Sequence, residues 1–141
     1  MPASERGLEV VGGWVEKAEN DLKIATLALG AGEECPADTV AFHAQQCMEK
    51  YLKAYIVSQG MDFPRTHDLE ELIAVVDPRL RIGLSVEEQR RFTAYATVTR
   101  YPGDYEPISL TEARRAVAAA RRVRREIRRL LPKGALLRRR K

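Results

Sequence analysis

The sequence predicts an all-α protein, an up-and-down antiparallel bundle of four to five helices. Apolar residues recur every three or four positions over five segments, and no segment shows the strict alternation typical of a strand. A Gly or Pro follows each of the five segments, and short connections between amphipathic helices favour antiparallel packing. A chain of 141 residues is long enough to bury about 70% of its unfolded surface, so we expect a core without a disulfide or a metal. We expect a single helical domain over residues 1–131 and a basic tail over residues 132–141.

The first two predicted helices cover about residues 14–29 and 38–59. The first begins at Trp14 with a regular apolar stripe, and Gly30 ends it. Asp38 is a suitable N-cap for the second. The apolar stripe of the second helix is the most regular in the chain and predicts its buried face: Ala41, Ala44, Cys47, Met48, Tyr51, Leu52, Tyr55 and Ile56.

Three further helices are marked by capping signals. The pairs that resemble capping boxes or caps are Asp68 with Glu71, Ser85 with Glu88, and Ser109 with Glu112. Pro78 limits the first of these helices and Pro132 limits the last. The middle one should end near Arg100, because Pro102 disfavours helical geometry at Tyr101.

Charge is distributed unevenly along the chain. Residues 114–141 contain 13 Lys or Arg and one acid, a net charge of +12, although the whole chain carries only +4. Residues 1–113 therefore carry −8. The apolar positions of the last helix, Leu130 and Leu131 included, keep helical spacing, so most of these arginines are expected on a solvated face. The same segregation would also attract phosphates, an acidic partner or a second copy.

Several classes of protein are not indicated. The N-terminal residues lack a long apolar run and no stretch reaches about 18 apolar residues, so we expect a soluble cytoplasmic protein with no membrane contact. Cys35 and Cys47 lack zinc-ligand spacing, and His43 and His67 have no supporting ligands, so no metal and no cofactor is predicted. No Gly-rich phosphate loop, Ser/His/Asp grouping or HExxH motif is present.

Polar residues of the second helix form the first candidate site. They lie opposite the apolar stripe and comprise His43, Gln46, Glu49, Lys50 and Lys53. Gln46, Glu49 and Lys53 are candidate ligand-binding residues. Glu49 and Lys53 are also an ordinary i, i+4 surface pair, and a hydrogen-bond network between helices explains the stripe equally well.

His67 is the second candidate. It immediately precedes the third helix, where an imidazole either binds a phosphate or bonds a neighbouring carbonyl. The third candidate is the loop that follows Arg100, which prolines at 102 and 107 stiffen. A fixed guanidinium suits a phosphate or a phosphodiester, and the same loop presents Tyr101, Asp104 and Tyr105. No histidine lies in this loop to act as a general base, and tyrosine, with its pKa near 10, is a poor substitute.

Together, these motifs resemble those of HEPN-domain proteins, small helical bundles that also include the C-terminal domain of sacsin. The resemblance spans residues 14 to about 131. Four strings carry it in order: Ala18-Glu-Asn-Asp-Leu22, Phe42-His-Ala-Gln-Gln-Cys-Met-Glu-Lys50 with Lys53-Ala54, Thr66-His67-Asp68-Leu69, and Arg100-Tyr101-Pro102. It implies a bundle of four to five helices that forms a homodimer and is often produced beside a minimal nucleotidyltransferase.

The family implies two different functions. Many HEPN proteins are metal-independent ribonucleases of toxin-antitoxin or defence systems and use an Arg followed by four to six residues and a His. Arg100 matches that arginine, but Tyr105, Glu106 and Pro107 occupy the positions of the histidine, which argues against an enzyme. His67 or Tyr105 would have to replace it in proton transfer. Other members resemble nucleotide-binding accessory subunits, and in some modules the transferase adenylylates a tyrosine, here Tyr105 or Tyr101. A third interpretation is a non-catalytic oligomerisation module.

Overall fold

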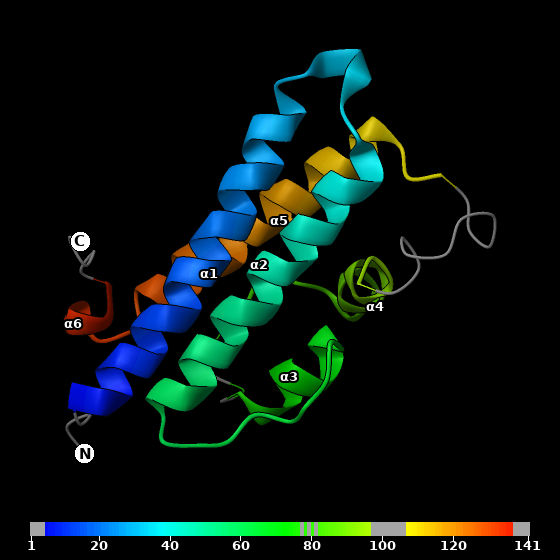
Figure 1. The fold of residues 1–141 in the computed structure, drawn as a ribbon. Helices are drawn as coiled ribbons and strands as arrows, with labels where there is room; N and C mark the ends of the chain where they lie inside the picture. Colours follow the sequence, from blue (N-terminus) through cyan, green and yellow to red (C-terminus); the bar gives the residue numbers. More distant parts are fainter. Residues whose placement is uncertain (1–4, 77, 79, 81, 97–106, 137–141) are drawn as a thin grey trace.

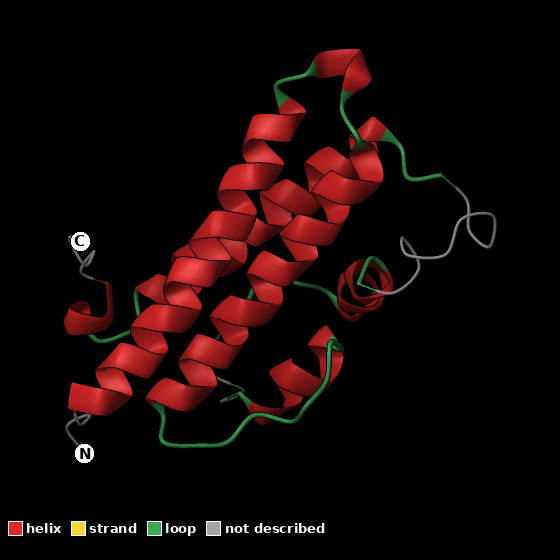
Figure 2. Cartoon of the chain, in the orientation of Figure 1, coloured by secondary structure: helices red, strands yellow, loops and turns green. Residues whose placement is uncertain are grey.

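Every regular element of the protein that the structure describes is a helix (Figures 1 and 2). The computed structural model describes residues 5–76, 78, 80, 82–96 and 107–136. Three long helices lie side by side and form the body of the bundle: α1 (Glu5–Leu29), α2 (Ala37–Ser58) and α5 (Leu110–Arg128). Shorter elements flank them: the 3-10 turn η1 (Gly32–Glu34), α3 (Leu69–Val75), α4 (Val86–Ala94) and α6 (Lys133–Leu136). The predicted all-α bundle is confirmed.

Helix α2 lies at the centre of the bundle, between α1, α5 and α3 (Figure 1). Every apolar residue predicted for its buried face is buried. Burial also extends to Gln45, Glu49 and Lys53 on the side that the sequence assigns to polar groups. Glu49 and Lys53 are therefore not a surface pair, because α3 and the connection leading to it cover that side of α2.

Helix α1 begins at Glu5, nine residues before the predicted start at Trp14. Three glycines in this added segment, Gly7, Gly12 and Gly13, disfavour a helix by propensity, yet Val11 beside Gly12 is almost fully buried. A Cβ on Gly12 would lie 3.1 Å from the carbonyl oxygen of Ala135. The missing side chain lets α6 pack directly against α1, within the segment that the sequence describes as a tail.

The caps agree with the sequence for α4 and α5 and differ elsewhere. Ser85 forms a complete capping box with Glu88, and the Ser109 hydroxyl accepts a hydrogen bond from a backbone N–H of the first turn of α5. Asp68 caps α3 by accepting from the backbone of Glu70, without the reciprocal bond predicted from Glu71 in this described segment. Residue 36, a proline, takes the N-cap position of α2 in place of Asp38, whose side chain lies in the first turn.

Two predicted helix ends also change. Helix α4 ends at Ala94, earlier than the predicted end near Arg100, and Tyr95 follows as its C-cap. Helix α5 ends at Arg128, so Leu130 leaves the helical stripe and is 45% exposed instead of buried. None of the helices in the described ranges combines the length and the apolar character needed to cross a bilayer.

Candidate functional site

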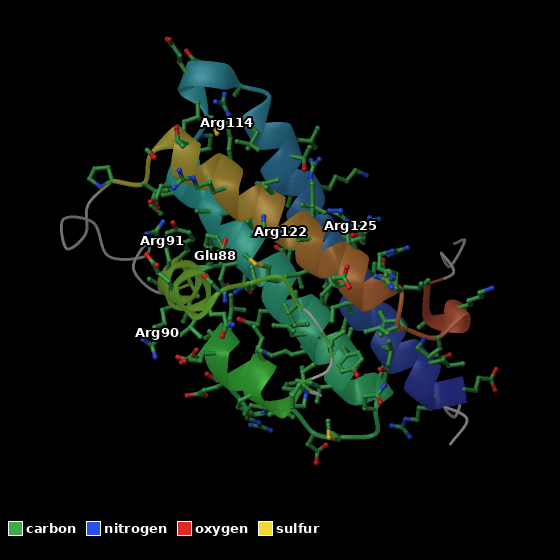
Figure 3. All side chains as sticks on the ribbon, turned by 180° about the vertical axis from the view of Figure 1, so that it is seen from behind. Glu88, Arg90, Arg91, Arg114, Arg122 and Arg125 are labelled. Carbon is green, nitrogen blue, oxygen red and sulfur yellow. The ribbon has the colours of Figure 1, made fainter. Side chains whose placement is uncertain are left out.

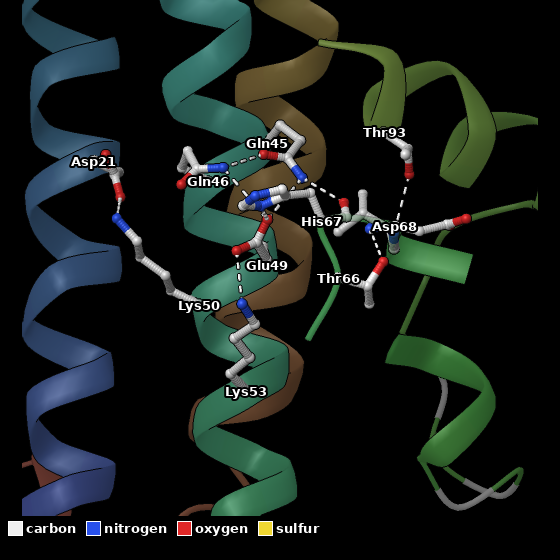
Figure 4. A network of polar contacts seen from close by, with 11 residues as sticks. Asp21, Gln45, Gln46, Glu49, Lys50, Lys53, Thr66, His67, Asp68 and Thr93 are labelled. Atoms are coloured by element: carbon white, nitrogen blue, oxygen red, sulfur yellow. Dashed lines mark hydrogen bonds and ion pairs between the residues drawn. The ribbon is translucent and has the colours of Figure 1, made fainter. Parts of the chain in front are cut away.

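A buried carboxylate between a lysine and a histidine forms the centre of the candidate site (Figure 4). The Glu49 Oε2 atom accepts from Lys53 Nζ at 2.9 Å, and Oε1 lies 2.9 Å from His67 Nδ1. Only 3% of the Glu49 side chain and 9% of the Lys53 side chain are exposed, against 56% for His67. We call these three residues the Glu49 triad. Its carboxylate and its lysine are buried, and its imidazole ring is exposed to solvent.

Amide side chains complete the surroundings of the carboxylate. Gln45 lies one helical turn before Glu49, and its Nε2 donates to Glu49 Oε1 at 3.3 Å and to the His67 carbonyl oxygen at 3.0 Å. Gln46 Nε2 donates to Gln45 Oε1 at 2.6 Å. These bonds fix the backbone of His67 as well as its ring, so the position of the imidazole is set by two independent contacts with α2.

The chain reverses after α2 to bring His67 back to it. Gly60 has a φ of 74°, a left-handed conformation that favours glycine, and it starts this reversal. The backbone N–H of Leu69 donates to Thr93 Oγ1 at 3.0 Å, which ties the start of α3 to α4. His67 therefore lies where the connection between α2 and α3 meets the bundle (Figure 4).

Two aromatic rings hold the lysine of the triad. Lys53 Nζ lies 5.5 Å from the ring centroid of Trp14 and 5.0 Å from that of Phe63. The two rings pack edge to face, with centroids 5.4 Å apart. An ammonium group is attracted by aromatic faces, so this packing holds Lys53 Nζ in place close to Glu49.

The charge of Glu49 indicates that the His67 nitrogen facing it, Nδ1, carries a hydrogen. Burial disfavours the charged form of Glu49, but hydrogen bonds from Lys53 and His67 outweigh that cost and hold its pKa below the ordinary value. Glu49 is thus ionised at neutral pH and accepts from Nδ1–H of His67. The other ring nitrogen, Nε2, has no partner within the described part of the chain. The exposed ring presents Nε2 to solvent, where it is available for a hydrogen bond.

The remaining polar residues of α2 belong to a second cluster, which we call the Asp21 triad. The Asp21 Oδ1 atom lies 2.8 Å from His43 Nδ1, and Oδ2 accepts from Lys50 Nζ at 2.6 Å. Both bonds join α1 to α2, and Figure 4 draws the one between Asp21 and Lys50. The Phe42 ring packs edge to face against His43, at 5.3 Å between centroids. This part of the predicted polar stripe is a helix–helix network.

The structure brings four predicted site residues into one place: Gln46, Glu49, Lys53 and His67. The other four, Arg100, Tyr101, Asp104 and Tyr105, lie outside the described residues. Sequence reasoning missed Phe63 and placed Trp14 only in the core. Neither carries a local signal for this role, because both reach Lys53 through the fold. Within the described ranges, no three His, Cys, Asp or Glu side chains are placed to bind a metal ion.

The fold places this chain in the class of small helical-bundle proteins, here with a buried carboxylate behind an exposed histidine. The family model of the HEPN domain matches residues 11–130, so the chain belongs to the HEPN-domain family. Among solved structures, it is similar to TT1696 from Thermus thermophilus, with 24% identity and a TM-score of 0.73 over 87% of this chain and 99% of that one. This likeness establishes a shared fold. A search of curated proteins gives no significant match.

Proposed function

We propose that this chain is a non-cleaving HEPN module that binds a nucleotide or another phosphate between His67 and the Arg100 loop. One observation carries the proposal: an exposed imidazole is held from behind by a buried, ionised carboxylate. The proposed role is that of an accessory subunit, a homodimer working with a minimal nucleotidyltransferase, as membership of the family implies.

The chemistry of the site suits an anion. Glu49 fixes the His67 ring through Nδ1, so that Nε2 would face a phosphate oxygen and would donate to it when the imidazole is protonated. Arg100 would supply a bidentate guanidinium, and Tyr101 and Asp104 would line the site. Gln46, Glu49 and Lys53 act from behind by fixing the ring. Tyr105 is the proposed acceptor if the partner transferase adenylylates this chain.

Calorimetry with ATP, GTP and a short RNA tests this proposal. The wild-type chain should bind ATP or GTP, and Arg100→Ala and His67→Ala should each weaken that nucleotide binding about tenfold, the loss of one charge-assisted contact. Arg90→Ala is the matched control, because Arg90 is exposed and, among the described residues, pairs only with Glu70. Absence of binding, or binding that is indifferent to both site substitutions, contradicts the proposal.

The same histidine favours a second candidate function, a metal-independent ribonuclease. A carboxylate that orients an imidazole through Nδ1 is the arrangement used by general bases and acids. His67 would then replace the missing histidine of the nuclease motif, Tyr105 would assist, and Arg100 would stabilise charge at phosphorus. Incubation of RNA with the purified dimer separates the two functions. Cleavage that is lost in both Arg100→Ala and His67→Ala supports the ribonuclease, whereas intact RNA excludes it.

A further inference from the structure

Positive charge gathers on one pair of helices. Helices α4 and α5 contain nine arginines and four glutamates, whereas α1 contains three basic and five acidic residues. Figure 3 places Arg114, Arg122 and Arg125 along α5, with Arg90 and Arg91 on the neighbouring α4. The charge segregation of the sequence is therefore also a segregation in space, with a basic face formed by α4 and α5.

Some of these arginines hold the bundle together. Arg124 donates to both carboxylate oxygens of Glu19 on α1, at 2.8 and 2.9 Å, and these bonds raise the arginine's pKa further. Arg122 pairs with Glu88 on α4 at 3.1 Å. Such residues have partners within the fold, and their charge is largely compensated.

Other arginines on the same helix are exposed and uncompensated. The side chains of Arg114, Arg115 and Arg125 form no hydrogen bond or ion pair within the described ranges. Arg114 and Arg125 are three helical turns apart, about 16 Å along the axis, and so share one side of α5. Arg121 lies between them on that side and donates only to the neutral Thr26 hydroxyl, at 3.1 Å. Together they form a row of guanidinium groups along a straight helix.

A shallow groove of about 410 Å³ runs beside this row, between α4 and α5. Its residues include Arg91, Phe92, Tyr95, Glu112, Arg115 and Arg122. Phe92 and Tyr95 are themselves buried, so neither ring is available for stacking. Three glutamates, Glu87, Glu88 and Glu112, also line the groove and offset the charge of its three arginines. A polyanion is therefore expected to follow the exposed arginine row and the edge of the groove.

We propose that this row on α5, with Arg115 at the groove edge, binds the phosphate backbone of a nucleic-acid strand without reading its sequence. Every basic residue of α4 and α5 is an arginine, whose planar fork pairs with phosphate. A row of positive charges along one helix axis is complementary to a linear polyanion. Helix α5 exposes no large apolar side chain, the usual anchor of a protein interface. The surface shares no residue with the His67 site, so the inference goes beyond the proposed function.

Fluorescence anisotropy with a labelled single-stranded RNA of about 12 nucleotides tests the inference. The triple variant Arg114→Gln, Arg115→Gln, Arg125→Gln should bind at least about tenfold more weakly at low salt. Loss of three phosphate contacts should also reduce the slope of log affinity against log salt by about two. Gln has a helix propensity close to that of Arg, and all three residues are exposed, so the helix content should be retained.

The matched control removes the same charge from α1, through Arg6→Gln, Lys17→Gln and Lys23→Gln, which are exposed and without ion pairs in the described ranges. It should change RNA affinity by less than about twofold. An equal loss in both triples overturns the inference, because net charge alone would explain it. Absence of RNA binding, or equally tight binding of polyglutamate, also overturns it. His67→Ala should leave the binding unchanged, which separates this surface from the nucleotide site.

Discussion

The Asp21 triad and the Glu49 triad contain the same three kinds of side chain in different surroundings. Each has a carboxylate, a histidine bonded through Nδ1 and a lysine. In the Asp21 triad, the histidine and lysine are similarly accessible, at 23% and 21%. In the Glu49 triad, the lysine is buried and the histidine is exposed. The first arrangement joins two helices, and the second directs a fixed ring toward solvent.

This contrast separates a structural network from a candidate site with the same chemistry. Asp21 receives its partners from one neighbouring helix, α2, so each contact contributes to helix packing. Glu49 receives Lys53 from its own helix and His67 from a returning connection. The second geometry adds little to the packing of long helices. What distinguishes the Glu49 triad is that it holds the His67 imidazole in one orientation.

The largest difference should appear when each lysine loses its charge. Lys53→Met leaves the buried Glu49 carboxylate without its cation and should lower the free energy of unfolding by about 3 kcal/mol. Lys50→Met, the matched change in the Asp21 triad, should cost about 1 kcal/mol because that pair is partly hydrated. Chemical denaturation of both variants measures the two losses. Equal losses would contradict the claim that the Glu49–Lys53 pair is buried whereas the Asp21–Lys50 pair is partly exposed.

Acid should weaken the Glu49 triad in a defined range of pH. The folded-state pKa of Glu49 is lowered from 4.5, so its contribution to stability is present above that value and is lost as pH falls through the lower pKa. We expect Glu49→Gln to be less stable at neutral pH and to lose less stability on acidification than the wild type. Denaturation midpoints measured from about pH 7 to about pH 3 provide the comparison.

The acid response of Glu49→Gln should not disappear completely. The pKa of Glu19 is also lowered, because hydrogen bonds from Arg124 and Tyr51 outweigh the effect of its partial burial. This second carboxylate keeps part of the acid sensitivity. Parallel stability curves for wild type and Glu49→Gln would mean that Glu49 carries no proton-linked stability.

Much of the fold could be predicted from local signals. The apolar stripe of α2 and the caps at Ser85 and Ser109 are read from residues within a few positions of each other, and all are observed. The predicted start of α1 at Trp14 was wrong. Gly12 has a low helix propensity, and its place in α1 depends on the close packing of α6 against it. The prediction used only neighbouring residues, whereas the role of Gly12 is a contact with a residue far along the chain.

The site was predicted in part for the same reason. Gln46, Glu49, Lys53 and His67 were selected from the sequence, but the spacing of Glu49 and Lys53 indicated an ordinary surface pair. Their burial depends on the packing of Trp14 and Phe63, which reach Lys53 from other segments. Pairing of Glu49 with His67 requires the chain to reverse after α2, and no local pattern encodes where that reversal places an imidazole.

The most direct test of the central claim compares the two histidines in one NMR experiment. The chain contains only His43 and His67, so their ring signals can be assigned with two single substitutions. Titration with ATP should shift the ring signals of His67 and leave those of His43 in place. No shift of the His67 signals, or equal shifts of both histidines, would contradict the claim that the Glu49 triad holds His67 for a phosphate ligand.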